Sequence, residues 1–464
     1  MLLGEIMRKL AAVILAAGQG TRMKSRTPKV LHPLAGRPLL QHVINLARTL
    51  EANPIVIVVG REGEAVGLKM EADDLVFVTQ EPQLGTGHAV MCAGSVLQDY
   101  GGDFLILYGD TPLLRERTLQ GLVEHHRSKG VSLTALVAQT PNPPSYGRVL
   151  RDSHGGVLRV VEERDATEEE RRIQEVNVGT YCAIPQALFK ALKTVDRNNT
   201  QGEYYLTDAV AALAPGGVET FEAQSLDEIL GINDRIDLAK AEEILQRRFR
   251  EYWMREGVTL QDPSTTYLAA DVRIGRDTVL EPQIILKGET RIGENCQIGT
   301  GSVIEDSALE NDVIVRPHSV VVGSHVACGA DIGPFAHLRF GSDIGAEVRI
   351  GNFVEVKKTR IGQGSMACHL TYLGDAEIGK HVMVGAGTIT CNYDGVKKNR
   401  TIMDDGAFIG SDAQLVAPVR VGKNAVVASG STITKDVPPG ALAVTRSRQV
   451  NLPSKARRRI QKKK

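Results

Sequence analysis

The sequence predicts a Rossmann-like α/β domain followed by a parallel β-helix, and three observations support this fold class. Residues 11–17 form a continuous aliphatic run that leads into a Gly-rich loop at Gly18 and Gly20, as a buried parallel strand before a phosphate loop would. Aliphatic residues recur at every sixth position from Ile274 onward. Helical patterns and aromatic residues lie mostly in the first half, whereas Gly and β-branched residues dominate after Ile274. A domain boundary within residues 230–265 follows.

Length, charge and cysteine content exclude several classes of protein. The 464 residues are too many for one hydrophobic core, so two domains are expected. Lys plus Arg and Asp plus Glu are balanced at 55 each, so neither nucleic acid nor an anionic membrane is an expected partner. The six cysteines lack zinc-site spacing and are interpreted as reduced thiols.

No segment predicts passage into or across a membrane. None approaches the roughly 20 apolar residues that a membrane-spanning helix needs. Residues 1–18 resemble a signal peptide superficially, but their apolar run is only about eight residues and continues directly into the basic Gly-rich loop. We interpret this run as a first strand and expect a cytoplasmic protein without stable membrane insertion.

Further elements of the first domain follow the order of a βαβ unit. Residues 40–50 predict an amphipathic helix, and residues 55–59 predict a second parallel strand. Residues 104–108 predict the next strand, which ends in Gly109 and Asp110. Ligands bind at the carboxyl edge of such sheets, and Mg²⁺ usually takes one or two oxygen ligands from protein. Asp110 is therefore the best candidate for a metal ligand.

The six-residue column predicts the β-helix, because one short strand per six residues, each with an aliphatic residue inward, winds the chain into a coil. Its members are Ile274, Leu280, Leu286, Ile292, Ile298 and Ile304, then, after a four-residue slip, Ile314, Val320, Val326, Ile332, Leu338, Ile344, Ile350 and Val356, and finally Ile409, Leu415, Val421, Val427 and Ile433. Such a coil is often only a scaffold. Residues 362–372, which carry His369, and residues 391–403 are interpreted as interruptions, where binding groups tend to lie.

The Gly-rich loop carries a resemblance to a known family. Gly18 and Gly20 let backbone N–H groups approach an anion, while Arg22 and Lys29 supply cations for a triphosphate. A G-x-G pair alone is weak support for this role. The longer pattern of residues 15–23 with Pro28 and Lys29 resembles the signature of sugar-1-phosphate nucleotidyltransferases. Joined to the repeat, it resembles the bacterial bifunctional family of N-acetylglucosamine-1-phosphate uridylyltransferase and glucosamine-1-phosphate N-acetyltransferase, over residues 9–450.

The resemblance implies Mg²⁺-dependent uridylyl transfer from UTP to N-acetylglucosamine 1-phosphate in the first domain, with release of pyrophosphate. Arg22 and Lys29 would neutralise phosphate charge, and Asp110 and Asn233 would hold the metal. Asn233 could equally cap the helix that residues 235–256 predict, and both roles can coexist. The implied binding residues of this site are Leu15, Ala16, Ala17, Gly18, Lys29, Gln80, Gly85, Thr86, Tyr108, Gly109, Asp110, Gly147, Glu162, Asn177 and Asn233.

The same resemblance implies transfer of an acetyl group from acetyl-CoA, as co-substrate, to glucosamine 1-phosphate in the second domain. His369 would be the general base, because the amine must lose a proton near neutral pH. The implied acceptor residues are Arg339, Lys357, Tyr372 and Met383, and the implied acetyl-CoA residues are Ala386, Asn392, Tyr393, Ser411, Ser429 and Arg446. The chain departs from the family pattern in having Met383 for Asn, Phe340 for Pro and Ser429 for Ala.

For the whole chain, the resemblance implies a left-handed coil, a homotrimer, and synthesis of UDP-N-acetylglucosamine for peptidoglycan, lipopolysaccharide and cell-wall formation. The expected domains are residues 1–230, a linker helix at 231–256, and residues 257–464 with a basic tail. One alternative is a glucose-1-phosphate nucleotidyltransferase with a purely regulatory β-helix, against which His369 and the 391–403 segment count. Another is a non-catalytic scaffold, against which Arg22, Lys29 and Asp110 count. Diffusion between the two sites is the default expectation.

Overall fold

The computed structural model describes residues 9–61, 63–70, 72–141 and 145–453. The chain divides into two compact units, Met1–Leu245 and Gln246–Lys464, and the division falls within helix α9 (Arg235–Arg255). The expected domain boundaries at residues 230 and 256 remain predictions. The basic tail at 455–464 and residues 1–8 lie outside the described residues. In the described ranges, no helix has both the length and the apolar character needed to cross a bilayer.

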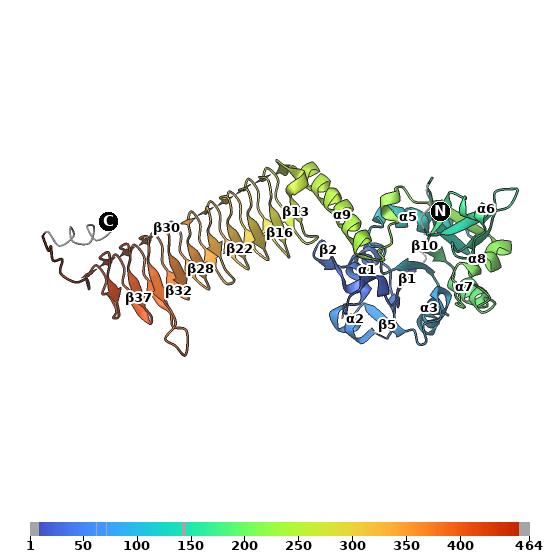
Figure 1. Cartoon of the computed structure of the whole chain (residues 1–464), viewed down its shortest axis with the longest axis horizontal. Helices are drawn as coiled ribbons and strands as arrows, with labels where there is room; N and C mark the ends of the chain where they lie inside the picture. Colours follow the sequence, from blue (N-terminus) through green and yellow to red (C-terminus); the bar gives the residue numbers. More distant parts are fainter. Residues whose placement is uncertain (1–8, 62, 71, 142–144, 454–464) are drawn as a thin grey trace, which may run out of the picture. The chain divides into compact units, whose positions relative to one another are not determined.

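A nine-stranded sheet forms the centre of the first unit (Figure 1). Its main path runs β11-β7-β10-β6-β1-β4-β5, with β8 and β9 attached beside β10. The strands are β1 (Leu10–Ala16), β4 (Ile55–Val59), β5 (Leu75–Thr79), β6 (Asp103–Tyr108), β7 (Leu133–Gln139), β8 (Gly147–Arg151), β9 (Val157–Val161), β10 (Glu175–Ala183) and β11 (Val218–Glu222). The central strand β1 pairs in parallel with both β4 and β6, which confirms the three predicted strands to within one residue.

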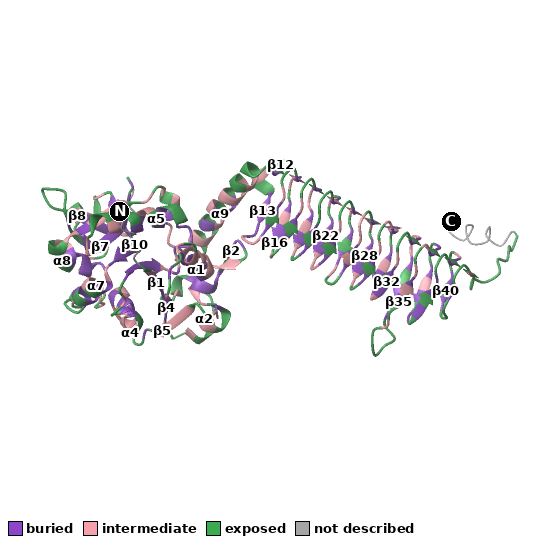
Figure 2. Cartoon of the chain, turned by 180° about the vertical axis from the view of Figure 1, so that it is seen from behind, coloured by how far each residue is buried: buried purple, intermediate pink, exposed green. Residues whose placement is uncertain are grey.

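Helices pack on both faces of this sheet and make it a three-layer α/β unit. They are α1 (Leu39–Thr49), α2 (Gly63–Met70), α3 (Thr86–Cys92), α4 (Gly94–Leu97), α5 (Glu116–Lys129), α6 (Glu168–Arg171), α7 (Pro185–Leu192) and α8 (Asp208–Leu213). Successive β1 side chains point to opposite faces: Val13 packs in the core under α3, α7 and α8, while Ile14 packs in the core under α1. Figure 2 shows the central strands as largely buried.

The second unit is a parallel β-helix of three faces, with eleven, ten and nine strands in its described part. The first face runs from β12 (Thr259–Leu260) to β41 (Leu442–Ala443), the second from β13 (Tyr267–Leu268) to β40 (Thr432–Ile433), and the third from β14 (Arg273–Ile274) to β38 (Val419–Val421). Each strand pairs in parallel with the equivalent strand of the next coil, as Leu280 does with Ile298. The inward residues of all coils form one continuous hydrophobic core.

The inward column differs from the predicted one at two positions. Ile314 and Val320 face outward and are half-buried, whereas Val315 and Val321 are buried. The cause is two steps of five residues rather than six, from Ile304 to Leu309 and from Val321 to Val326, whereas the predicted column places the whole shift before Ile314. Because aliphatic residues occupy both neighbouring positions, the six-residue period could not distinguish them.

The predicted interruption at residues 362–372 is wrong. Strand β30 (Met366–His369) continues the coil in register with β27 (Arg349–Asn352), and Ala367 takes the inward position beside Ile350. The small Ala367 hides the aliphatic column in the sequence. Residues 391–403 do leave the coil: a loop at 392–400 separates β34 (Ile389–Cys391) from β35 (Thr401–Met403).

Replacing an inward residue should cost far more stability than replacing its outward neighbour. Leu286, in β16 (Ile285–Lys287), is fully buried, so Leu286→Ala should lower the free energy of unfolding by roughly 2–5 kcal/mol. Ile285 points outward from the same strand, so the control Ile285→Ala should lower it by less than half as much. Denaturant unfolding followed by circular dichroism measures both, and equal losses would contradict the inward assignment.

Candidate active sites

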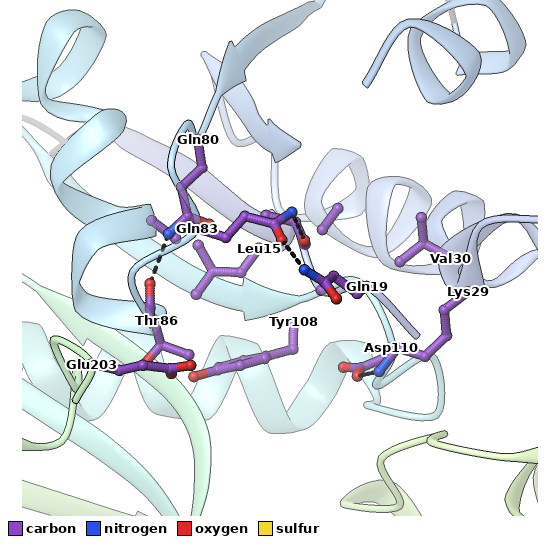
Figure 3. Close-up of a pocket in the computed structure, with 15 residues that line it drawn as sticks. Leu15, Gln19, Lys29, Val30, Gln80, Gln83, Thr86, Tyr108, Asp110 and Glu203 are labelled. Atoms are coloured by element: carbon purple, nitrogen blue, oxygen red, sulfur yellow. Dashed lines mark hydrogen bonds and ion pairs between the residues drawn. The ribbon is translucent and has the colours of Figure 1, made fainter. Parts of the chain in front are cut away.

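A cavity of about 410 Å³ lies at the carboxyl edge of the sheet in the first unit (Figure 3). Ten predicted residues line it: Leu15, Ala16, Ala17, Gly18, Lys29, Gln80, Gly85, Thr86, Tyr108 and Asp110. Five others were not predicted as site residues: Gln19, Val30, Gln83, Ala89 and Glu203. The remaining predicted residues of this site, Arg22, Gly109, Gly147, Glu162, Asn177 and Asn233, are not part of the cavity wall.

Strand pairing brings the Gly-rich loop and Asp110 to the same edge. Leu15 in β1 lies opposite Tyr108 in β6, so both strands end side by side. The Gly109 amide donates to the Leu15 carbonyl at 2.9 Å and extends this pairing past the strand end. The loop after β1 and the carboxylate after β6 therefore meet across the cavity.

Lys29 and Asp110 form an ion pair at the cavity wall, and their side chains point toward one another in Figure 3. The side chain of Lys29 is 11% exposed and that of Asp110 is 20% exposed, so the pair is largely shielded from water. Gly20 makes this approach possible: it has φ +59°, and a Cβ at this position would lie 2.6 Å from Lys29 Cβ. Gly20 thus packs directly against the side chain of Lys29.

The backbone segment that carries Asn233 lies beside Asp110 in space. The amide of Ile232 donates to the Asp110 carbonyl at 2.9 Å, and Asn233 Oδ1 accepts from Arg22 Nη2 at 2.8 Å. Oxygen donors on two adjoining segments suit a cation that takes only one or two protein ligands, as Mg²⁺ does. The described residues contain no cluster of three or more His, Cys, Asp or Glu side chains that could hold a metal.

The alternative role of Asn233 as a helix cap is wrong. The side chain of Asp234 accepts from the amides of Ile236 and Asp237 at 2.9 and 3.0 Å and so satisfies the first turn of α9. Asn233 is therefore not required as the cap, and its amide oxygen faces Arg22.

The three predicted sugar residues lie on the β8–β10 side of the sheet. Gly147 pairs with Asn177 across β8 and β10. Asn177 is buried, donates to the Tyr181 hydroxyl at 2.7 Å, and keeps its buried Oδ1 without a hydrogen-bond partner. Glu162 accepts from Thr207 at 2.9 Å, and burial raises the pKa of its carboxyl.

Tyr108 connects the sugar residues to the cavity. Burial, and next the negative charge of Glu162, raise the pKa of the Tyr108 hydroxyl well above its usual value. Gly179, with φ +87°, allows this packing, because a Cβ there would lie 2.9 Å from the Tyr108 ring. Tyr108 is thus a neutral wall of the cavity between the Gly-rich loop and Glu162.

In the β-helix, His369 lies at the corner between the first and second faces. Its Nδ1 is 2.9 Å from Asn352 Oδ1, one coil earlier. An amide oxygen only accepts hydrogen bonds, so Nδ1 carries the proton and Nε2 keeps a free lone pair. Asn352 was not predicted, although it precedes His369 by the length of one coil.

The predicted acetyl-CoA residues Ala386, Ser411 and Ser429 occupy the same position on later coils that His369 occupies on its own, and the four form a column along this corner. Each is the second residue after an inward residue of the first face, and those inward residues pair from coil to coil. Arg446 Nη1 donates to the Ser429 carbonyl at 3.2 Å and extends the column. Tyr393 is not part of it: the hydroxyl donates within its own loop to Gly395, and the residue is 60% exposed.

Three of the predicted acceptor residues, Arg339, Lys357 and Tyr372, lie on or beside the second face. Arg339 donates to Glu355 at 2.7 Å, and Glu355 pairs with Tyr372 on the next coil. Asn392 donates to the Tyr372 hydroxyl at 3.3 Å and to Asp375 at 2.6 Å, which anchors the 392–400 loop. Met383 projects from the first face and is 47% exposed.

Lys398, which no sequence pattern indicated, completes a cluster of cations. Contact with its ammonium group is the largest cause that lowers the pKa of Lys357 below its usual value, and Arg339 adds to this effect. Lys398 Nζ lies 4.0 Å from Asp375. Within the loop, hydrogen bonds from the amides of Lys397 and Val396 to Asp394 hold the loop conformation. The same bonds lower the pKa of Asp394 to about 2. Three cations concentrated at one corner suit a phosphate group.

Comparisons with known protein families agree with the two units. Residues 12–208 match the MobA-like NTP transferase domain. Residues 265–365 match the GMPPB C-terminal domain, and residues 401–435 match the hexapeptide repeat of succinyl-transferase.

Similar full-length proteins carry both units. The bifunctional protein GlmU of Geobacillus sp. (strain WCH70) is 50% identical over 447 residues, covering 96% of this chain and 97% of that protein. Its counterpart from Shouchella clausii (strain KSM-K16) is 50% identical over 442 residues, with 95% and 97% covered. The one from Pelobacter propionicus (strain DSM 2379 / NBRC 103807 / OttBd1) is 49% identical over 448 residues, with 96% and 97% covered.

Removing Lys398 should raise the pKa of Lys357 toward its ordinary value. The pKa of Lys357 is lowered by a neighbouring positive charge, so Lys398→Met favours the protonated form and reduces the free amine at a given alkaline pH. Competitive labelling with acetic anhydride across pH, read by mass spectrometry, measures this shift. Lys423→Met is the control, and an unchanged Lys357 titration in Lys398→Met would contradict the proximity of the two ammonium groups.

Proposed function

The chain belongs to the GlmU family of bifunctional proteins, and from that premise we propose which activity each of its two units carries out. The enzyme combines uridylyltransferase and acetyltransferase activities and acts in UDP-N-acetylglucosamine biosynthesis. We assign uridylyl transfer to residues 1–230 and acetyl transfer to residues 257–464, joined by residues 231–256. Glucosamine 1-phosphate is acetylated first, and the product then reacts with UTP.

In uridylyl transfer, a phosphate oxygen of N-acetylglucosamine 1-phosphate attacks the α-phosphorus of UTP while the bond to pyrophosphate breaks. No protein nucleophile is needed, so the site must bind, align and neutralise the phosphates. The size of the cavity suits a nucleotide, and Lys29 lines it. Triphosphate oxygens would compete with Asp110 for Lys29 and with Asn233 for Arg22, which places both cations on the substrate.

Asp110 and Asn233 are the residues that would hold Mg²⁺. When bound, the ion would neutralise charge on the triphosphate and on the departing pyrophosphate. Release of Lys29 and Arg22 to the phosphates frees the oxygens of Asp110 and Asn233. Gly147, Glu162 and Asn177 would bind the sugar; the buried, unpartnered Oδ1 of Asn177 supports this role because it can accept a hydrogen bond from a hydroxyl or amide group.

In acetyl transfer, the amine nitrogen of glucosamine 1-phosphate attacks the thioester carbonyl of acetyl-CoA. The nitrogen loses a proton to His369 Nε2 as the N–C bond forms, and the C–S bond then breaks to release CoA. Arg339, Lys357 and Lys398 would bind the acceptor phosphate, and Tyr372 and Met383 would contact the sugar. Acetyl-CoA would lie along the corner column of Ala386, Ser411 and Ser429, with Arg446, Asn392 and Tyr393 as further contacts.

The hydrogen bond between His369 and Asn352 is the observation that carries the assignment of two activities. A β-helix that served only as a scaffold would not need an imidazole held in one tautomer at its surface. Two assays on one preparation test the proposal: release of pyrophosphate from UTP with N-acetylglucosamine 1-phosphate, and release of free thiol from acetyl-CoA with glucosamine 1-phosphate. Absence of thiol release alone would favour a regulatory β-helix.

We further propose a homotrimer built on a left-handed coil. Phe335 and Phe353 are 49% and 55% exposed and stack on adjacent coils with ring centroids 5.4 Å apart. Large apolar side chains exposed in a row indicate a surface that another protein covers. Because UTP and acetyl-CoA are intracellular metabolites, the proposed place of action is the cytoplasm.

Asp110→Ala should abolish Mg²⁺-dependent pyrophosphate release, with a loss of at least about 100-fold, because it removes a metal ligand and leaves Lys29 without its partner. Acetyl transfer should stay within about twofold of wild type, since Asp110 lies in the other unit. The matched control is Asp99→Ala, at an exposed site. Near-normal pyrophosphate release by Asp110→Ala would exclude Asp110 as a metal ligand.

His369→Ala should reduce acetyl transfer by about 10²–10⁴-fold, the usual contribution of a general base, and leave uridylyl transfer unchanged. Asn352→Ala should give a smaller loss, because it removes only the group that fixes the tautomer. His337→Ala, at an exposed site on the same β-helix, is the control. Loss of both activities in His369→Ala would point to a folding role instead.

A further inference from the structure

Gln83 links the two segments that border the cavity in the first unit. Its Nε2 donates to the Ala17 carbonyl at 2.6 Å, and its Oε1 accepts from Gln19 Nε2 at 3.0 Å. Figure 3 shows the Gln83 side chain extended between Gln80 and Gln19, over the cavity. One carboxamide thus ties the segment before α3 to the Gly-rich loop.

Gly60, at the end of β4, leaves the space through which Gln83 passes. A Cβ at this position would lie 2.0 Å from Gln83 Nε2 and 2.9 Å from the Ala17 oxygen. Any side chain at residue 60 would therefore displace the carboxamide from the Ala17 carbonyl. The loop that carries Gln83 is itself held in place, because the Leu84 carbonyl accepts from the Tyr204 amide at 2.8 Å.

The hydrogen bond to the Ala17 carbonyl also sets the orientation of the Gly18 amide. In a trans peptide unit, the C=O and the following N–H point in opposite directions. A donor that holds the Ala17 carbonyl on the Gln83 side therefore turns the Gly18 N–H to the opposite side. It also covers a carbonyl oxygen that would otherwise repel phosphate in a loop whose N–H groups should face it.

We propose that Gln83 is a positioning residue for the triphosphate: it holds the Ala17–Gly18 peptide in the orientation that offers the Gly18 N–H to UTP. This inference rests on the proposed uridylyl transfer at the same cavity. Gln83 need not touch the substrate, because it acts through the peptide that it holds. Gly60 takes part as the residue that leaves room for this contact.

Steady-state kinetics and binding on the full-length protein test the role of Gln83. Gln83→Ala should weaken UTP binding and raise the KM for UTP by about tenfold, while the KM for N-acetylglucosamine 1-phosphate stays within about twofold. Binding of uridine, which has no phosphate, should be unchanged when measured by ligand-observed NMR. A purely structural role would weaken uridine and UTP together, and that result would overturn the proposal.

A second variant disrupts the contact between Gln83 and Ala17 without changing Gln83. Gly60→Ala should reproduce the loss of UTP affinity, because its Cβ displaces the carboxamide. The double variant Gly60→Ala with Gln83→Ala should be no worse than either single variant, since both remove one interaction. Gly67→Ala and Gln98→Ala are the controls: a Cβ at Gly67 meets nothing within 4 Å, and Gln98 is exposed. Fully additive losses would overturn the proposal.

Two measurements, wild-type activity and acetyl transfer, distinguish failure of the proposed function from failure of the inference about Gln83. If wild-type protein releases no pyrophosphate from UTP, the proposed function fails. If it does and both single variants bind UTP as tightly as wild type, the inference about Gln83 fails alone. Acetyl transfer, which belongs to the other unit, should be unchanged in every variant. If circular dichroism shows that Gln83→Ala has lost folded structure, Gly60→Ala decides the question: weaker UTP binding with unchanged uridine binding supports the proposal, and unchanged UTP binding overturns it.

Discussion

In-register pairing of successive coils is the constraint on which the chemistry of the second unit depends. Each coil places its residues beside the equivalent residues of the next, so side chains one coil apart in sequence become neighbours in space. Asn352 meets His369 for this reason alone. The backbone hydrogen bonds of the coil thus decide which imidazole nitrogen carries the proton, and hence which one can act as a base.

The first unit reaches comparable precision by different means. Parallel strands bring the Gly-rich loop and Asp110 to one edge, a relation that follows from topology. Other contacts depend on segments far apart in the chain: Arg22 and Asn233 are 211 residues apart, and Gln83 and Ala17 are 66 residues apart. Before any substrate arrives, Lys29 is paired with the Asp110 carboxylate and Arg22 with the Asn233 amide oxygen, and this set keeps a net charge of +1.

Sequence patterns predicted three of the nine strands of the sheet and the existence of the β-helix, because burial imposes their periodicity directly. They failed where two residues were equally apolar, as at Ile314 and Val315, and where a small residue hid the period, as at Ala367. Lys398 and Gln83 were missed because their roles come from tertiary contacts. Neither residue type is distinctive, and nothing local marks a lysine that faces another lysine.

Beyond Leu268, the coil changes length at one corner only. After Leu268, inward residues are six apart from the third face to the first and from the first to the second, whereas the first such step, from Leu260 to Leu268, is eight residues. From the second face to the third the step shortens to five at Ile304–Leu309, Val321–Val326, Val356–Ile361 and Leu373–Ile378, and the same corner holds the 392–400 loop while the strands on both sides stay paired. His369 lies at a corner of constant length, whereas Lys357 and Lys398 lie at the variable one. Insertions could therefore remodel recognition of the acceptor without moving the base, so that specificity and proton transfer can evolve separately.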